Sequence, residues 1–384
     1  MSERSLIRVG VLGGGQLARM LALAGAPLGT KFLMLDTDAN ACGGQVAAVM
    51  QADYRDLDAL GHFAAQIDIA TFDFENVPAD SAAWLAERVP VFPNPRALGV
   101  AQDRMAEKSL FRGLGIGTPA FAAVDTLDQL RAAVEQILPS ILKTRRLGYD
   151  GKGQFRLRQP ADVEAAWAAL AHGQPQASLI LEAFVPFDSE LSVVGVRGRD
   201  GEFRSYPLTR NWHHEGILSL SLAPAEVSDD IAARAVAHAQ ALADALDYVG
   251  VFALELFEQG GELLANEMAP RVHNSGHWTI EGAVSSQFEN HLRAVLGLPL
   301  GDTATRGHSA MLNWIGELPD CAAALTVPGL HWHDYGKSAR PGRKVGHATL
   351  RADSAAQLAD ALERAGQVLQ RQPQVQPAID ALRG

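Results

Sequence analysis

The sequence predicts an α/β protein with more than one domain. In the first hundred residues, short apolar and β-branched runs alternate with helical patterns, which is the order expected of a parallel, doubly wound sheet. Two apolar runs on either side of Gly260-Gly261 predict a hairpin, and residues 308–350 predict a small β-rich domain towards the C-terminus. At 384 residues the chain is long for one core, so two or three packed domains are expected.

The elements of the N-terminal part are short and closely spaced. Strands are expected at residues 7–12, 32–35 and 67–72, and helices at residues 16–24, 57–66 and 78–88. The proline-rich segment 90–99 interrupts this pattern, so we place the first domain boundary near residue 100.

The remainder of the chain mixes helices and strands. Helices are expected at residues 104–111, 127–138, 161–171, 230–246, 283–296 and 355–369, and strands at residues 140–143, 179–182, 249–257 and 262–268. Ser228 is the expected N-cap of the helix over 230–246, because its hydroxyl can accept a hydrogen bond from the first turn. The helix over 355–369 is expected to end the fold.

The composition predicts a globular cytoplasmic protein. Apolar residues make up 47% of the chain and charged residues 20%. The net charge of −11 would repel a nucleic-acid backbone, and no long basic patch offsets it. No segment has the roughly 20 apolar residues that a membrane-spanning helix requires. Cys42 and Cys321 lack metal or redox spacing and are expected as free thiols, with a disulfide as the less favoured alternative.

The run from Lys143 to Gln154, KTRRLGYDGKGQ, has the residues of a phosphate-binding loop. Its glycines and the polar residues between them are Gly148, Tyr149, Asp150, Gly151, Lys152 and Gly153. Glycines let the backbone approach a ligand and point N–H groups at an anion, and the two lysines would neutralise a polyphosphate. The alternative is an ordinary hairpin turn, because Asp-Gly is a frequent turn pair.

A second glycine cluster, Gly13-Gly14-Gly15-Gln16-Leu17-Ala18, lies between a predicted strand and a predicted helix. Backbone amides at a helix N-terminus can hold a phosphate or pyrophosphate. The spacing also fits G-x-G-x-x-A, and Asp36 follows the second strand, so a nicotinamide dinucleotide site is an alternative. Turns of this kind also serve only for close packing.

Two glutamates on the predicted hairpin suggest a metal site. Glu255 and Glu267 lie six residues on either side of Gly261, and alternation places Glu267 on one face with Leu263 and Ala265. Paired strands would bring their Cβ atoms to about 4.5–5.5 Å, which is unfavourable without a cation between the carboxylates. Mg²⁺ bound to nucleotide phosphates fits this role, and Mn²⁺ could replace it. The alternative is a register in which one glutamate faces solvent.

A polar stretch follows the second glutamate, at residues 266–277. His273 and His277 have the spacing of a helical zinc pair, but a nearby proline and glycine argue against a helix, and no acidic residue lies between them. An anion-binding wall of Arg271, His273 and Asn274 is the favoured interpretation.

Two further segments have residues suited to ligands. Glu182-Ala183-Phe184-Val185 ends a strand-like run whose backbone could bind an adenine edge while Glu190 binds ribose hydroxyls, although a plain strand end is the simpler interpretation. Near the C-terminus a basic cluster, unusual in an acidic protein, suggests a phosphate or carboxylate ligand, with a solvated loop as the alternative. Its members are Lys337, Arg340, Arg343 and Lys344.

Taken in order, these motifs resemble the ATP-grasp superfamily and, within it, the 5-(carboxyamino)imidazole ribonucleotide synthases of purine biosynthesis. The matching segments span essentially the whole chain: VGVLGGGQLARM, TFDFENV, LKTRRLGYDGKGQ, LEAFVPFDSELSVV, GVFALELF, NEMAPRVHNSGHWTIE and HDYGKSARPGRKVGH. The resemblance implies an N-terminal ribonucleotide-binding domain (1–100), an ATP-grasp small lobe with a glycine-rich lid (101–190), a large lobe with the Mg–ATP carboxylates (191–300) and a C-terminal domain that completes the substrate site (301–384).

The resemblance also implies how the nucleotide is held. ATP would lie between domains, its phosphates near Arg104, Lys143 and the loop from Gly148 to Gln154. The remaining implied contacts are Glu182 to Val185 at adenine, Glu190 at the ribose, His213 near the nucleotide, Asn266 and Glu267 beneath the phosphates, and Glu255 with Glu267 on Mg²⁺. Many superfamily members have an asparagine as third metal ligand where this chain has Ala269, so water is the expected replacement.

On the substrate side the resemblance implies 5-aminoimidazole ribonucleotide and bicarbonate as partners, and a homodimer. The ribonucleotide would meet Gln16 and Leu17, Glu75 at the imidazole, and the basic cluster with its phosphate. The residues around bicarbonate and the amine would be Tyr149, Asp150, Lys152, Arg271, His273 and Asn274, with Asp150 or His273 helping to remove the amine proton. The alternatives are a formate-dependent glycinamide ribonucleotide transformylase-like enzyme, a nicotinamide-dependent oxidoreductase, and a nucleotide-sensing or scaffold protein.

Overall fold

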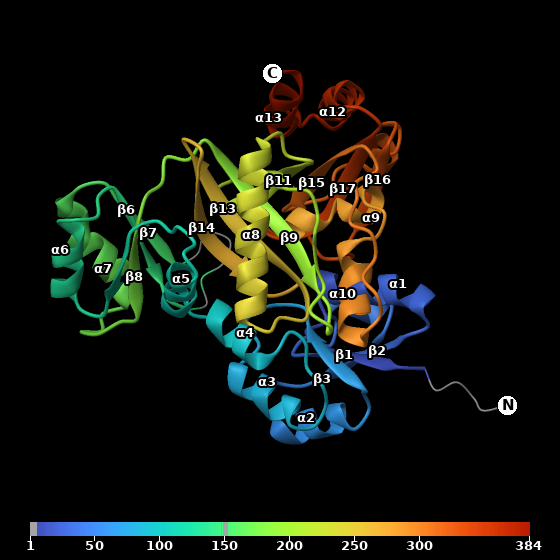
Figure 1. The fold of residues 1–384 in the computed structure, drawn as a ribbon, viewed down its shortest axis with the longest axis horizontal. Coiled ribbons are helices and arrows are strands. Elements are labelled where there is room, and N and C mark those ends of the chain that lie inside the picture. Colours follow the sequence, from blue (N-terminus) through green and yellow to red (C-terminus); the bar gives the residue numbers. More distant parts are fainter. Residues whose placement is uncertain (1–5, 147, 149–152) are drawn as a thin grey trace.

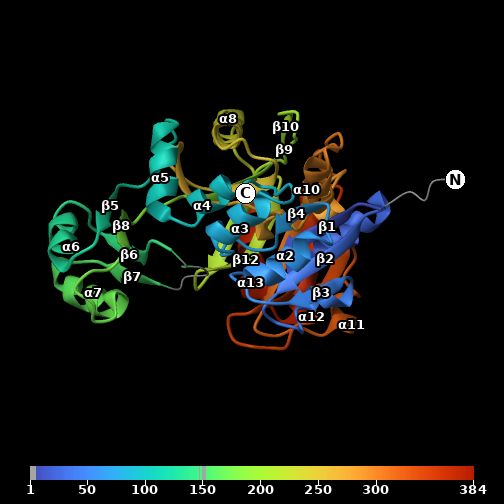
Figure 2. The same ribbon diagram turned by 90° about the horizontal axis from the view of Figure 1, so that it is seen from below.

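The computed structural model describes residues 6–146, 148 and 153–384, which form three β-sheets with helices packed against them (Figure 1). Figures 1 and 2 both show that a four-stranded sheet, with helices α6 (Leu127–Val134) and α7 (Val163–Ala171), is set apart from the rest of the molecule. Four residues that the sequence predicts at the ligand site lie outside the described residues, namely Tyr149, Asp150, Gly151 and Lys152. No helix in the described part of the chain is long and apolar enough to cross a bilayer. Cys42 is a buried free thiol and Cys321 an exposed one.

The N-terminal part is built on a parallel sheet in the order β3-β2-β1-β4, which confirms the doubly wound prediction. Its elements are β1 (Arg8–Leu12), α1 (Gln16–Gly25), β2 (Lys31–Asp36), β3 (Ala48–Gln51), α2 (Leu57–Ala64), β4 (Ile69–Phe72), α3 (Ala79–Ala86) and α4 (Pro95–Ala101). α1 packs on one face against Val11 and Met34, while α2 and α3 pack on the other against Leu12 and Phe72. β3 was not predicted from the sequence, because it is a short edge strand of four residues that is only partly buried.

The second sheet is antiparallel, in the order β5-β8-β6-β7. The elements of this region are α5 (Arg104–Gly113), β5 (Phe121–Val124), α6 (Leu127–Val134), β6 (Ser140–Thr144), β7 (Gln154–Leu157), α7 (Val163–Ala171) and β8 (Leu179–Ala183). α6 and α7 share one apolar cluster with the sheet. β6 and β7 form a hairpin in which Lys143 lies opposite Gln154, so the glycine-rich segment connects two paired strands.

The third sheet is antiparallel throughout, in the order β14-β13-β9-β11-β12-β15-β17-β16, with β10 paired to β9. The elements of its first part are β9 (Ser189–Arg197), β10 (Phe203–Ser205), β11 (Thr209–His214), β12 (Ile217–Ala223), α8 (Asp229–Ala245), β13 (Gly250–Gln259), β14 (Glu262–Ala269), α9 (Thr279–Gly282) and α10 (Gln287–Leu296). α8 packs against Phe252 and Leu254, and α10 packs on the opposite face against Val251 and Ala253. α10 also contacts α1, which joins the third sheet to the N-terminal sheet.

The C-terminal part continues this third sheet. Its elements are β15 (His308–Ile315), α11 (Cys321–Ala324), β16 (Leu330–Asp334), β17 (Lys344–Ala352), α12 (Ala355–Leu369) and α13 (Gln372–Arg383). β12 pairs with β15, so strands on either side of residue 300 belong to one sheet. The prediction that α12 ends the fold is wrong, because α13 follows it and packs in the same apolar cluster. A proline in the first turn and Pro377 inside α13 concealed this helix in the sequence.

Candidate active site

A cavity of about 1110 Å³ lies between the three sheets and brings the predicted ligand contacts together. Every described residue that the sequence predicts at a binding or catalytic position lines it: Gln16, Leu17, Glu75, Arg104, Lys143, Gly148, Gly153, Gln154, Glu182, Ala183, Phe184, Val185, Glu190, His213, Glu255, Asn266, Glu267, Arg271, His273, Asn274, Lys337, Arg340, Arg343 and Lys344. Residues more than 300 positions apart in the chain therefore share one space, as Gln16 and Lys337 do through a direct hydrogen bond.

The two hairpin glutamates lie opposite one another, as predicted. β13 and β14 pair antiparallel with Glu255 across from Glu267, but the register shifts beside this pair, because Leu256 lies across from Ala265. Asn266 is thus the extra residue of a β-bulge. The bulge places both Asn266 and Glu267 at the cavity, on the face opposite to Ala265. The prediction that Glu267 shares a face with Ala265 is wrong, because simple alternation fails at the bulge.

Basic side chains contact both carboxylates. Glu267 accepts a hydrogen bond from Arg104 at 3.0 Å, and Glu255 Oε1 lies 3.1 Å from His273 Nε2. Burial alone would raise the pKa of Glu255, but the hydrogen bond from His273, with the charges of His213 and Lys344, outweighs it and lowers the pKa. Glu255 is therefore a carboxylate at neutral pH.

The donor set fits a cation that is shared with another ligand. In the described part of the chain, no group of three or more His, Cys, Asp or Glu side chains could hold a metal ion. Glu255 and Glu267 offer oxygen ligands of the kind that Mg²⁺ prefers, and both face the cavity. Two carboxylates leave the other positions of an octahedral ion to water or phosphate oxygens, which is the usual arrangement of nucleotide-bound Mg²⁺.

A buried ion-pair cluster lies at the junction of α5, β6 and β8. Glu182 Oε2 lies 3.0 Å from Lys143 Nζ and 3.3 Å from Lys108 Nζ, and Lys108 also donates to the Asn266 carbonyl at 3.1 Å. Burial would raise the pKa of Glu182, but these lysines and Arg104 lower it to about 2. Both lysines therefore bind Oε2 of Glu182, whereas its buried Oε1 has no hydrogen-bond partner in the described part of the chain.

Sequence reasoning missed two charged residues of α5. Lys108 is fully buried, and buried Glu107 accepts a hydrogen bond from the Met268 N–H at 2.6 Å. Burial and the charge of Glu267 raise the pKa of Glu107 to about 8. A signal for both was available, because Arg104, Glu107, Lys108 and Phe111 have the i, i+3, i+4, i+7 spacing of one helix face.

Aromatic and apolar side chains line another part of the cavity. Phe187 stacks on Phe257 with ring centroids 4.8 Å apart, and the Arg156 guanidinium lies 4.4 Å from the Phe184 centroid. All four residues line the cavity, so this region suits a flat aromatic ligand such as a purine base.

Glu190 and His213 form a polar pair at the same cavity. The Glu190 carboxylate lies 2.7 Å from His213 Nδ1. Burial lowers the pKa of His213, but the hydrogen bond and charge of Glu190 outweigh this effect and raise it. Glu190 keeps its second oxygen for a ligand hydroxyl, which agrees with the expected ribose contact.

Most amides of the first glycine cluster are bound within the chain, contrary to one expectation from the sequence. The Gly14 N–H donates to Asp36 at 2.6 Å, while Gly15 and Ala18 donate to Asp73 at 2.5 and 2.8 Å. Two carboxylates of the chain thus occupy the place where a pyrophosphate would bind a dinucleotide fold. Asp73, which sequence reasoning missed, is buried and holds the first turn of α1 in place.

Ion pairs order the proposed ribonucleotide side of the cavity. Glu75 pairs with Arg271, and Lys337 donates to Gln16. Burial would raise the pKa of Glu75, but the charge of Arg271 lowers it. Burial also lowers the pKa of Lys337. This side therefore combines one carboxylate with several cations, which suits a ligand with a basic ring and a phosphate.

Comparison with known families agrees with this geometry. A ribonucleotide synthetase preATP-grasp domain matches residues 6–102, an ATP-grasp domain matches residues 109–288, and a phosphoribosylaminoimidazole carboxylase C-terminal domain matches residues 309–361. The N5-carboxyaminoimidazole ribonucleotide synthase of Pseudomonas aeruginosa is 54% identical over 358 residues, covering 92% of this chain and 96% of that protein. The chain belongs to the N5-carboxyaminoimidazole ribonucleotide synthase family.

Solved structures of N5-carboxyaminoimidazole ribonucleotide synthases share the fold over nearly the whole chain. The Thermus thermophilus synthetase superposes with a TM-score of 0.90 at 53% identity, covering 95% of this chain and 99% of that one. The Aspergillus clavatus enzyme, solved in complex with ADP and 5-aminoimidazole ribonucleotide, has a TM-score of 0.84 at 32% identity, covering 98% and 99%.

Membership of the synthase family makes this chain an ATP-grasp ligase and confirms the resemblance that its motifs predicted. The oxidoreductase alternative depended on the first glycine cluster and Asp36. In the structure, Asp36 accepts a hydrogen bond from the Gly14 N–H. The glycine turn and the acid that would each bind part of a dinucleotide are therefore bound to one another. That alternative is therefore wrong.

Proposed function

We propose that this protein uses ATP and bicarbonate to carboxylate the exocyclic amine of 5-aminoimidazole ribonucleotide, giving 5-(carboxyamino)imidazole ribonucleotide, ADP and phosphate. The observation that carries the proposal is the single cavity in which the described nucleotide and ribonucleotide contacts lie together. Two sets of cations line this cavity from different parts of the chain, Arg104 with Lys143 and Lys337 with Arg343. A reaction between two phosphorylated ligands requires a separate set of cations for each ligand.

The chemistry follows from the weak electrophilicity of bicarbonate. Transfer of the γ-phosphoryl group of ATP to a bicarbonate oxygen gives ADP and carboxyphosphate, whose phosphate can leave. The amine nitrogen, attacking carboxyphosphate or the CO₂ released from it, then bonds to the carbon. The C–O bond to phosphate breaks, and the nitrogen loses one proton.

The residues of the cavity have distinct tasks in this proposal. Arg104 and Lys143 bind the ATP phosphates, and Glu75 with the basic cluster orients the ribonucleotide. Arg271 and His273, with Tyr149, Asp150 and Lys152, surround bicarbonate and the amine. Glu255 and Glu267 hold Mg²⁺, or Mn²⁺ in its place. When bound there, the cation offsets charge on the phosphates during transfer.

We also propose a cytoplasmic homodimer with the four-part division 1–100, 101–190, 191–300 and 301–384. The three sheets support the boundaries near residues 100 and 190, whereas residues 191–300 and 301–384 both contribute strands to the third sheet. Light scattering coupled to size-exclusion chromatography tests the dimer, because a 41.0 kDa chain would elute at twice its mass.

ADP release tests the reaction. The purified protein is supplied with ATP, Mg²⁺ and ¹³C-bicarbonate, with and without 5-aminoimidazole ribonucleotide, and formate replaces bicarbonate in a parallel series. We expect ADP release to require the ribonucleotide and bicarbonate, and the ¹³C label to appear as a carbamate in the product. Strict dependence on formate would overturn the proposed substrate while leaving the ATP site intact.

A further inference from the structure

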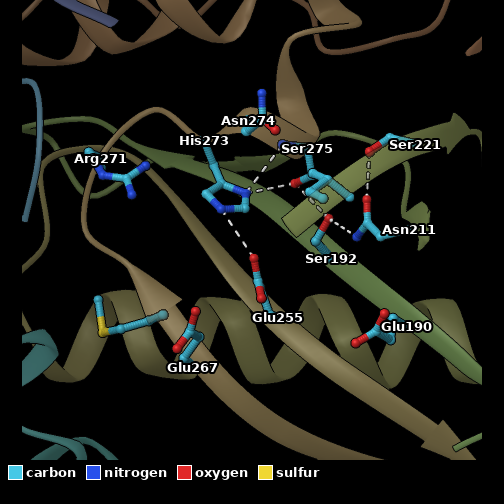
Figure 3. A network of polar contacts seen from close by, with 12 residues as sticks. Glu190, Ser192, Asn211, Ser221, Glu255, Glu267, Arg271, His273, Asn274 and Ser275 are labelled. Atoms are coloured by element: carbon cyan, nitrogen blue, oxygen red, sulfur yellow. Dashed lines mark hydrogen bonds and ion pairs between the residues drawn. The ribbon is translucent and has the colours of Figure 1, made fainter. Parts of the chain in front are cut away.

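A row of buried polar side chains crosses the third sheet beneath His273 (Figure 3). In the strand register Glu255 of β13 lies opposite Ser192 of β9, and Asn211 of β11 lies opposite Ser221 of β12. Partners that are directly opposite share a face of a sheet, so this row extends the face that carries the two glutamates. Ser192 and Ser221 are fully buried, and Asn211 is 6% exposed.

The hydrogen bonds of this row all point from donor to acceptor towards His273. The Ser221 hydroxyl donates to Asn211 Oδ1 at 2.7 Å, and Asn211 Nδ2 donates to Ser192 Oγ at 3.1 Å. Ser192 Oγ donates to the fully buried Ser275 Oγ at 2.8 Å. The hydrogen of Ser275 is then free to point at His273 Nδ1, which lies 2.8 Å away.

The backbone fixes the same direction independently. The Ser275 N–H also donates to His273 Nδ1, at 3.3 Å, so the histidine side chain caps the 3₁₀ turn Asn274–Gly276. A backbone N–H can only donate, so Nδ1 must accept. Nδ1 therefore receives two donors, and the ring proton belongs on Nε2. That nitrogen faces Glu255 Oε1 at 3.1 Å, an acceptor.

We propose that Ser192, Asn211, Ser221 and Ser275 are positioning residues that hold His273 in its Nε2–H tautomer, so that it donates a hydrogen bond towards Glu255 and the cavity. Neither ring nitrogen then has a free lone pair. In this tautomer the nitrogen that faces Glu255 carries a hydrogen and Nδ1 is turned towards Ser275, so His273 acts as a hydrogen-bond donor in the proposed carboxylation, on which this inference rests. Its task is to orient the carboxylate of Glu255 and to present an N–H to an anionic ligand.

Because these polar side chains are buried, their hydrogen bonds constrain the orientation and tautomer of the His273 ring. Buried polar groups are costly unless they are hydrogen-bonded, and water has little access to replace a partner here. Ser192, Ser221 and Ser275 do not line the cavity, whereas His273 does. Substitutions in the row should thus alter the histidine and leave the ligand contacts in place.

The test combines a spectroscopic measurement with kinetics on matched serine variants. Histidine ¹⁵N spectra of the full-length protein without ligands distinguish a protonated ring nitrogen from a bare one, and loss of a signal in His273→Asn assigns it. Ser275→Ala and Ser192→Ala each remove one member of the row. Ser309→Ala is the control, because this buried hydroxyl has no hydrogen-bond partner in the described part of the chain.

We expect Nδ1 of His273 to be bare and Nε2 protonated in the wild type, and a smaller share of this tautomer in Ser275→Ala, where only the backbone N–H still donates to Nδ1. We expect kcat to fall about 10- to 100-fold in Ser275→Ala and by less in Ser192→Ala, because second-shell partners have effects of this size. The KM values for ATP and the ribonucleotide should change by no more than about twofold, as for a group that does not touch ligand. Ser309→Ala should match the wild type.

A protonated Nδ1 in the wild type would overturn the inference. So would a row variant that folds, keeps the wild-type tautomer and retains full kcat. If Ser275→Ala does not fold, Ser192→Ala and the wild-type spectrum still decide the question. If the wild type does not carboxylate the ribonucleotide, the proposed function fails, and the spectrum reports on the tautomer regardless.

Discussion

Replacing Lys108 with methionine should destabilise the protein and weaken nucleotide binding. Its side chain is fully buried, and its ammonium group joins the Glu182 carboxylate to the Asn266 carbonyl, at 3.3 and 3.1 Å. Asn266 is the bulge residue beside Glu267, and Glu182 begins the segment expected at adenine. One side chain therefore sets the relative position of two parts of the ATP site.

The expected loss of stability in Lys108→Met is the balance of opposing contributions. At 3.3 Å the attraction between Lys108 and Glu182 is about 5 kcal/mol for an effective dielectric constant of about 20. Burial of the ammonium group costs several kcal/mol and offsets most of this attraction. Lys143 remains 3.0 Å from Glu182, so that carboxylate is not left alone. Loss of the donor to the Asn266 carbonyl costs about 1–3 kcal/mol. We expect a net loss of about 2–3 kcal/mol.

Urea unfolding monitored by tryptophan fluorescence measures the loss, and ADP release measures the KM for ATP. The KM for ATP should rise while the KM for the ribonucleotide stays near its wild-type value. Arg131→Met is the matched control, because it removes an exposed cation that pairs with Asp128 and Glu164 on the surface. Exposed pairs of this kind contribute little, so its unfolding midpoint should match the wild type.

An unchanged urea midpoint in Lys108→Met would refute this reasoning, since it would mean that desolvation cancels every contact of the ammonium group. A fall in stability with an unchanged KM for ATP would refute only the predicted effect on nucleotide binding. It would show that the position of the bulge at Asn266 does not depend on the buried ion pair.

Four further substitutions test other parts of the site. Glu255→Gln and Glu267→Gln should each lower kcat about 100-fold or more and raise the Mg²⁺ concentration needed for half-maximal rate, because each removes a charged ligand. A variant whose rate depends on Mg²⁺ concentration as the wild type does would contradict the assignment. Lys337→Ala should raise the KM for the ribonucleotide about 10- to 100-fold, the worth of one charged hydrogen bond, without changing the KM for ATP; an effect on ATP instead would place the two ligands the other way round. Folding lowers the pKa of Glu182 to about 2, so the unfolded chain binds more protons between about pH 2 and 4.5 and stability falls as the pH decreases through that window. Acid unfolding of Glu182→Gln, followed by circular dichroism, should lose this part of the pH dependence.

The sequence predicts most clearly those features that depend on local pattern. The helix Ala355–Leu369 was predicted to the residue, because its apolar positions recur at helical spacing after the Ser354 cap. Ser228 caps α8 as expected, through a hydrogen bond from Ile231. The hairpin of β13 and β14 follows from two apolar runs and a Gly-Gly turn. Each of these depends on neighbours in the chain.

Features that depend on distant partners were not predictable in this way. The β-bulge at Asn266 adds one residue to a strand of ordinary composition, so period-two alternation assigns Glu267 to the wrong face. Asp73 resembles any polar residue after a strand, and its role appears only when the Gly15 and Ala18 amides approach it. The resemblance to a family supplied the roles of residues, whereas the structure supplied their partners.

The partners of the site acids suggest how its ligands depend on one another. Glu267 pairs with Arg104, and Glu255 lies against His273, so each proposed metal ligand is bound to a base of the chain itself. A phosphate that binds Arg104 takes the partner of Glu267 and leaves that carboxylate in need of another cation. A divalent cation between the glutamates likewise frees the arginine for phosphate. With the proposed contacts, phosphate and cation each supply the partner that the other takes away. We therefore expect nucleotide and cation to bind with a favourable coupling free energy, which is reciprocal by thermodynamic necessity.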